Sequence, residues 1–149
     1  MANQYSYRAS AHWSGHKRGI VEGEGIPRTI NFAAPPEFGG EPGLWTPEHL
    51  LVAAISTCYV ATLRAVAEAS KLDFLSLELN LEGTIEKQEG GFRFTRIQMR
   101  PVVTIDKPED RERMGRLLEK AERVCLISRS LSCSIVLEPK ILVQEPVHA

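Results

Sequence analysis

Three cysteines, Cys58, Cys125 and Cys133, are the residues of this sequence best suited to covalent chemistry. A cysteine reacts as its thiolate, so a reactive thiol needs a neighbouring group that stabilises negative charge. A free cysteine on an apolar face also packs simply as a small hydrophobic residue. The three cysteines therefore suggest thiol chemistry, but none of them proves it alone.

Other kinds of site have little support in the sequence. There is no Cys-x-x-Cys pair, and the four histidines are not at metal-ligand spacing: His12, His16, His49 and His148. No glycine-rich phosphate loop or Gly-x-Ser-x-Gly motif occurs. We therefore expect no metal and no bound cofactor.

The composition is that of an ordinary globular protein. The chain has 149 residues, 43% of them hydrophobic, and its 18 basic and 19 acidic residues give a net charge of -1. This length predicts a single domain over residues 1–149, and the balanced charge gives no reason to expect nucleic-acid binding. The longest aliphatic run, residues 50–55, is far shorter than a membrane span, and the start of the chain does not resemble a signal peptide. We expect a cytoplasmic protein that does not cross a membrane.

The first third of the chain predicts a small sheet. Residues 5–13 alternate apolar and polar side chains, as in a strand with one buried face. Two shorter strands are expected near residues 19–24 and 29–32, and residues 33–46 are rich in proline and glycine, which indicates a loop.

A long helix is expected over residues 47–70. Thr46 can cap it, Pro47 suits its first position, and Glu48 places negative charge at the positive end of its dipole. Its apolar residues cover much of its surface, including a stripe at steps of three and four residues: Leu51, Ala54, Cys58, Ala61, Ala65 and Ala69. We expect this helix to be buried on several sides, partly by a second copy of the chain.

The remaining sequence predicts two strands, a helix and a last strand. The leucines of residues 75–81 alternate with polar residues, and the returning strand changes phase near Thr95 and Arg96, which indicates a bulge. A helix beginning at Pro108 places Cys125 on its apolar face, and residues 134–143 form a strand in which Pro139 indicates an edge or a bulge. The fold class is α+β, in the order β-β-β-α-β-β-α-β.

Three segments resemble the OsmC/Ohr family. They are the Pro-Glu-x-Leu run from Pro47 and Glu48 to Cys58, the loop of residues 36–40, and the second cysteine motif of residues 124–128. The resemblance implies an OsmC-like fold with the long helix packed on an antiparallel sheet, and an intertwined homodimer with active sites at the subunit boundary. It also implies a peroxidase that reduces organic hydroperoxides.

The same resemblance implies roles for individual residues. Cys58 is the nucleophile, an arginine stabilises its thiolate, and Glu48 orients that arginine. Arg18 is the counterpart in the turn of residues 15–19, but His16 and Lys17 interrupt the family pattern, so Lys17 and Arg28 stay open as alternatives. Glu48 and Cys58 lie about 15 Å apart along one helix, so a shared pocket requires elements of a second chain.

The implied reaction converts Cys58 to a sulfenic acid, which condenses with Cys125 to form a disulfide. An external dithiol, of the lipoyl type implied by the family, then restores both thiols. Cys133 has no counterpart in the family motifs and is interpreted as packing or as an alternative resolving thiol. Apolar residues that could favour bulky peroxides also suit ordinary core packing: Phe38, Trp45, Leu51 and Tyr59.

Two other functions remain open at this stage. The first is a non-enzymatic dimer of the same fold that senses redox state or binds a small ligand. The second is a purely structural dimer. The sequence does not identify the peroxide, the physiological reductant or the subgroup of the family.

Overall fold

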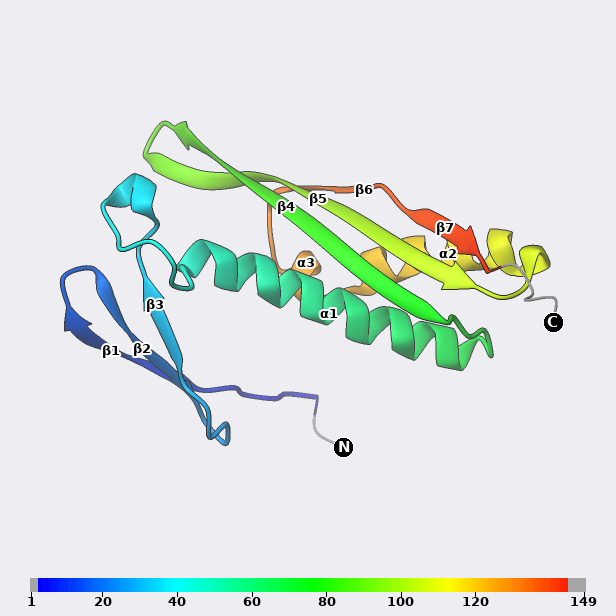
Figure 1. Cartoon of the computed structure of the whole chain (residues 1–149), viewed down its shortest axis with the longest axis horizontal. Helices are drawn as coiled ribbons and strands as arrows, with labels where there is room; N and C mark the ends of the chain where they lie inside the picture. Colours follow the sequence, from blue (N-terminus) through cyan, green and yellow to red (C-terminus); the bar gives the residue numbers. More distant parts are fainter. Residues whose placement is uncertain (1–2, 145–149) are drawn as a thin grey trace. The chain divides into compact units, whose positions relative to one another are not determined.

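The computed structural model describes residues 3–144, and its elements confirm the α+β class (Figure 1). The chain divides into two compact units, one ending at Leu51 and the other beginning at Val52. Each unit contains one sheet. His148, one of the four scattered histidines, lies outside the described residues.

The first unit contains a three-stranded antiparallel sheet, as the sequence predicts. Its strands are β1 (Ala9–Gly15), β2 (Arg18–Gly23) and β3 (Ile30–Ala33), in the order β1-β2-β3. A tight turn joins β1 to β2, and both Gly15 and His16 have positive φ there, 135° and 48°. A short 3-10 helix, η1 (Pro36–Phe38), follows in the expected loop.

The prediction of a buried strand face over residues 5–13 is wrong for the single chain. The strand begins only at Ala9, and Tyr5, Tyr7 and Trp13 are 75%, 93% and 78% exposed. β1 is an edge strand of a small sheet, so the alternation produces an apolar face that nothing in the described part of its own unit covers.

The long helix α1 (Pro47–Ala69) begins where the capping residues predict. The backbone N–H of His49 donates to Thr46 Oγ1 over 3.0 Å, and Thr46 is 2% exposed. This hydrogen bond satisfies one of the donors that a helix leaves unpaired at its start. The N-cap prediction is therefore confirmed.

The predicted buried stripe of α1 is wrong. The buried residues are Ile55, Tyr59, Leu63 and Ala67, whereas Cys58 is only half-buried. In the single chain the helix is therefore covered along one stripe and not on several sides. Apolar residues lie all round the helix axis, so the sequence does not indicate which side is buried. In the structure, Tyr59 lies on the buried side, and its hydroxyl donates to the Leu118 carbonyl over 2.9 Å.

The second unit is built on a long hairpin of β4 (Ser76–Gln88) and β5 (Gly91–Ile105). Thr84 pairs with Arg96 and Ile85 pairs with Phe94, so Thr95 is the extra residue of a bulge. The bulge predicted near Thr95 and Arg96 is confirmed. The sequence places Leu75 on the apolar face of this strand, but Leu75 precedes β4 and is 53% exposed.

The last strand is two strands. β6 (Ser134–Leu137) and β7 (Lys140–Val143) pair with β5 in parallel, so this sheet is mixed and not purely antiparallel as expected. The interruption contains Pro139, which has no N–H to donate to a neighbouring strand. Figure 1 shows β6 and β7 one after the other along β5, the strand with which both pair.

Two helices connect the hairpin to β6. After a 3-10 turn, η2 (Pro108–Asp110), come α2 (Arg111–Val124) and the short α3 (Leu126–Arg129). Cys125 is fully buried, but it lies between the helices in an extended conformation with φ -60° and ψ 115°. The prediction that it lies within a helix is therefore wrong, and the separate α3 was not predicted.

By length and composition alone, α1 is apolar enough to cross a membrane, and 22% of its most apolar window is buried in the single chain. The core helix of a globular protein meets the same criterion. α1 also carries Arg64, which forms ion pairs with Glu68 at 3.2 Å and Asp73 at 2.9 Å.

Candidate active site

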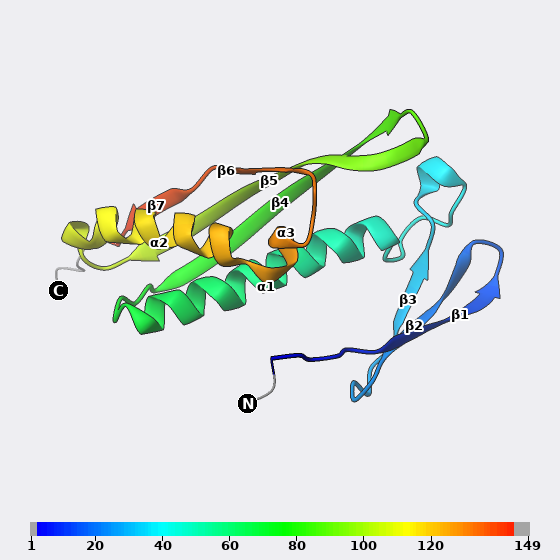
Figure 2. The same cartoon turned by 180° about the vertical axis from the view of Figure 1, so that it is seen from behind.

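The site is centred on Cys58, which lies half-buried in α1. Its sulfur is 3.9 Å from Thr62 Oγ1, one helical turn further along. The thiol of Cys125 and the backbone N–H groups of Leu126 and Ile127 also lie close enough to this sulfur to stabilise its charge. Figure 2 shows α3 beside the middle of α1, in agreement with these contacts.

These donors make Cys58 more acidic than an ordinary cysteine. Burial of the thiol opposes ionisation, but hydrogen bonds from Ile127 N–H, Cys125, Thr62 and Leu126 N–H together outweigh it, so the pKa of Cys58 is lowered. Leu126 and Ile127 are the first residues of α3, where backbone N–H groups lack partners within the helix. The local backbone therefore stabilises the thiolate.

Cys125 shows the opposite behaviour. Burial raises the pKa of its thiol, the hydroxyl and N–H of Ser128 act to lower it, and the neighbouring Cys58 raises it further. The net effect is a raised pKa. When the two thiols share one proton, Cys58 thus holds the negative charge and Cys125 donates the hydrogen bond.

The structure brings the two predicted redox cysteines together within one unit. A nucleophile with a lowered pKa beside a protonated thiol is the arrangement needed to oxidise one sulfur and then trap it as a disulfide. The supporting groups were missed at the sequence level. Thr62 follows Cys58 by four residues, which is a usable helical signal, but α3 is too short to produce a recognisable periodicity.

Arg18 lies at the start of β2, where its Nη1 pairs with Glu41 Oε2 over 3.0 Å. The pair borders an open pocket of about 360 Å³ that is lined by residues of the first unit: His16, Lys17, Arg18, Gly39, Gly40 and Glu41. Lys17 donates from Nζ to the carbonyl of Phe38 over 2.7 Å. Arg28, the other alternative, is exposed. The structure therefore gives Arg18 an acidic partner, but one that the sequence did not identify.

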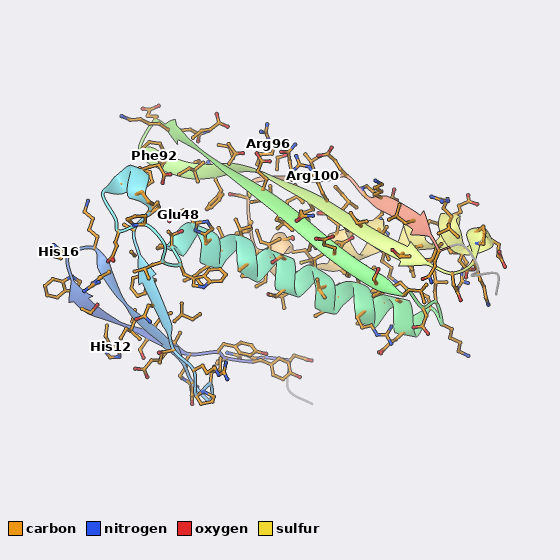
Figure 3. The ribbon with its side chains drawn as sticks, viewed as in Figure 1. His12, His16, Glu48, Phe92, Arg96 and Arg100 are labelled. Atoms are coloured by element: carbon orange, nitrogen blue, oxygen red, sulfur yellow. The ribbon has the colours of Figure 1, made fainter. Side chains whose placement is uncertain are left out.

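Glu48 does not form the expected hydrogen bond with Arg18 within the described chain. Its Oε1 is buried and has no hydrogen-bond partner among the described residues. Figure 3 shows Glu48 at the first turn of α1. Burying a carboxylate oxygen without a hydrogen-bond donor costs folding free energy. We therefore expect a cationic or polar partner for this atom beyond the contacts of the described residues.

The remaining predicted residues have simpler surroundings. Cys133 is a half-buried free thiol directly before β6, and it is not among the groups that act on Cys58 or Cys125. Tyr59 belongs to the core, while Trp45 is 51% exposed. No cluster of three or more histidine, cysteine or acidic side chains suited to a metal ion occurs among residues 3–144.

Comparison with known proteins decides the family. The model of the OsmC-like protein family matches residues 40–140, which include both cysteine motifs. The chain belongs to the OsmC-like protein family. The uncharacterized protein YmaD of Bacillus subtilis is 32% identical over 142 residues, covering 93% of each chain. The organic hydroperoxide resistance protein of Xanthomonas axonopodis pv. citri is 30% identical over 128 residues, covering 83% of this chain and 86% of the relative.

Solved structures confirm the OsmC-like fold. The organic hydroperoxide resistance protein OsmC from Legionella pneumophila superposes with a TM-score of 0.76 at 26% identity, covering 95% of this chain and all of the other. An OsmC-like protein of unknown function from Vibrio cholerae superposes with a TM-score of 0.81 at 19% identity, covering 91% and 99% of the two chains. The family thus includes organic hydroperoxide resistance proteins among its members.

Proposed function

We propose that this OsmC-like protein is a thiol-dependent peroxidase that reduces organic hydroperoxides to alcohols. The observation that carries the proposal is the thiol pair, in which Cys58 has a lowered pKa and the neighbouring thiol of Cys125 acts on its sulfur. The relatives named for organic hydroperoxide resistance support the choice of substrate.

In the first step, the Cys58 thiolate attacks the distal oxygen of the hydroperoxide. The O–O bond breaks, the alkoxide leaves and takes up a proton to become the alcohol, and Cys58 becomes a sulfenic acid. A positive group at this site stabilises the charge that develops on the leaving oxygen. Arg18 is our candidate for that group, with Lys17 and Arg28 as alternatives.

In the second step, the Cys125 sulfur attacks the Cys58 sulfenic acid, and a disulfide and water are formed. A dithiol, such as a lipoyl group, then reduces the disulfide by exchange and is itself oxidised to a disulfide. The protein returns to its starting state with both thiols restored.

We propose that the working unit is a homodimer in which each chain acts as one OsmC-like domain. Three features support it: the single buried stripe of α1, the exposed apolar side chains of Tyr5, Tyr7 and Trp13, and the Oε1 of Glu48, which has no partner among the described residues. A second chain would cover the apolar surfaces and bring a donor to the carboxylate. Sedimentation at micromolar concentration should give the mass of two chains, and a monomer would contradict this part of the proposal.

The function is tested by following consumption of tert-butyl hydroperoxide with dihydrolipoamide as reductant. We expect repeated turnovers for the wild-type protein and none above background for Cys58→Ser, because serine is a far weaker nucleophile than a thiolate. Cys133→Ser is the matched control, since it also removes one free, half-buried thiol, and it should retain the activity.

Two results would overturn the proposal. One is unchanged turnover in Cys58→Ser. The other is a single, stoichiometric oxidation of the wild-type protein without further turnover in excess hydroperoxide and dithiol, which would favour a redox sensor.

A further inference from the structure

Ser128 has a buried side-chain hydroxyl to which the proposed reaction has so far given no role. The residue lies in α3, three positions after Cys125, and is 5% exposed. Its Oγ has no hydrogen bond of normal geometry with any described residue. An unpartnered buried hydroxyl is uncommon, because burial without a hydrogen bond costs free energy.

The polar atom beside this hydroxyl is the sulfur of Cys125, on which both the Oγ–H and the backbone N–H of Ser128 act. A neutral thiol is a weak acceptor, so it gains little from such donors, whereas a thiolate gains much more. Hydrogen bonds that serve a reaction are often long in the resting protein and shorten once charge develops. The geometry of Ser128 fits a donor held ready for a charged Cys125.

We propose that Ser128 activates Cys125 for the resolving step by stabilising its thiolate when it attacks the Cys58 sulfenic acid. This inference rests on the proposed peroxidase function and assigns a residue to its second step. In the reduced protein, burial and the neighbouring Cys58 keep Cys125 protonated. Oxidation of Cys58 removes that negative charge, and the donors of Ser128 then act on Cys125 without opposition from Cys58.

The step balances without a further reactant. The S–H bond of Cys125 breaks, its sulfur forms the S–S bond with Cys58, and the S–O bond of the sulfenic acid breaks. The released hydroxide takes the proton from Cys125 and leaves as water. When the dithiol later reduces the disulfide, Cys125 is stabilised as a leaving thiolate by the same donors.

Few titratable groups can affect the pH dependence of disulfide formation. From α1, Cys58 and Tyr59 interact electrostatically with Cys125, and from α2, Glu122 acts on Tyr59. Burial, followed by the charges of Glu122 and Cys125, raises the pKa of Tyr59, so its hydroxyl stays protonated. After Cys58 is oxidised, Cys125 is thus the group whose ionisation controls disulfide formation.

The test separates the two oxidation steps. Reduced full-length protein is mixed with one equivalent of tert-butyl hydroperoxide across a range of pH, then quenched and analysed by intact mass. A dione that traps sulfenic acid reports the first step, and loss of two hydrogens reports the second. For Ser128→Ala we expect sulfenic acid formation within about twofold of wild type, disulfide formation slower by about tenfold, and its pH profile moved to higher pH.

Ser130→Ala is the matched control. Its hydroxyl directly follows α3 but donates to the Leu126 carbonyl over 2.9 Å, so its loss should leave both steps unchanged. Ser128→Thr keeps the hydroxyl and should retain wild-type disulfide formation. Denaturant unfolding of each variant checks that it is folded before its rates are compared.

Disulfide formation at the wild-type rate and with the wild-type pH profile in Ser128→Ala would overturn the inference. Equal slowing in Ser128→Ala and Ser130→Ala would also overturn it, because it would indicate a general disturbance of α3. Failure of the proposed function gives a different result, since the wild-type protein would then either leave Cys58 unoxidised or be oxidised once without further turnover in excess hydroperoxide and dithiol.

Discussion

The thiol pair and the charged residues expected to assist it are built in different ways. Cys58 and Cys125 meet within the second unit, where the first residues of α3 supply donors to the reactive sulfur. In the first unit, Arg18 pairs with Glu41, and the buried Oε1 of Glu48 has no partner among the described residues. Contacts with the local backbone and with neighbouring thiol and hydroxyl groups therefore lower the pKa of Cys58 without a cation.

The largest expected effect concerns the cation. Arg18→Met should slow sulfenic acid formation by about 100-fold to 1,000-fold, because it removes a charge that stabilises the departing oxygen. Rapid-mixing kinetics with an alkyl hydroperoxide measure this step. Lys17→Met and Arg28→Met are the controls and should stay within about threefold of wild type. A large loss in either control with little loss in Arg18→Met would transfer the role to the other residue.

Glu48 should have the next largest effect. Glu48→Gln keeps the size of the side chain but removes its charge, so the oxidation step should slow by about tenfold if the carboxylate orients the activating cation. The same change made with Arg18→Met should add little further loss, since both act through one interaction. Fully additive losses, measured by the same rapid-mixing assay, would show that the two residues act independently.

A smaller effect is expected when the hydrogen bond between the two thiols is removed. Cys125→Ala should raise the pKa of Cys58, because the thiolate loses a donor, and so slow its alkylation at pH 7 by about fivefold. A depressed pKa means that alkylation reaches half its maximum at a lower pH, and the profile should therefore move to higher pH in this variant. Cys125→Ser keeps a donor and should move the profile less. Identical profiles for wild type and Cys125→Ala would refute the proposed hydrogen bond.

The smallest effect on activity is expected at Tyr59. Tyr59→Phe removes the hydrogen bond to the Leu118 carbonyl and should lower the free energy of unfolding by about 1 kcal/mol. Sulfenic acid formation should stay within about twofold of wild type, because this contact holds α1 to α2 and does not involve the sulfur. Denaturant unfolding measures the first quantity, and a large loss of peroxide reactivity without a loss of stability would be contrary to this assignment.

The sequence predicted the hairpin of β4 and β5 and the start of α1 well, because their signals are local. The alternation along β4 and the phase change near Thr95 both report which side of a sheet each residue faces. The buried stripe of α1 was not predictable in the same way. Its apolar residues surround the axis, so contacts with other elements, such as the hydrogen bond from Tyr59 to Leu118 of α2, decide which side is covered.

The candidate site was predictable to a similar, limited extent. The motifs around Cys58 and Cys125 identified the two thiols, but not the groups that act on them. Apart from Thr62 on α1, those groups lie on α3, which is four residues long and begins directly after Cys125. The partner of Arg18 was missed because Glu41 comes from a loop with no periodic pattern.

The central claim is that Cys58 and Cys125 form one redox pair. The most direct test is intact mass and peptide mapping of the reduced protein after one equivalent of an alkyl hydroperoxide. We expect the loss of two hydrogens, with a disulfide that joins Cys58 to Cys125 and leaves Cys133 as a free thiol. A disulfide through Cys133, or an unmodified Cys58 after the hydroperoxide has been consumed, would contradict the account.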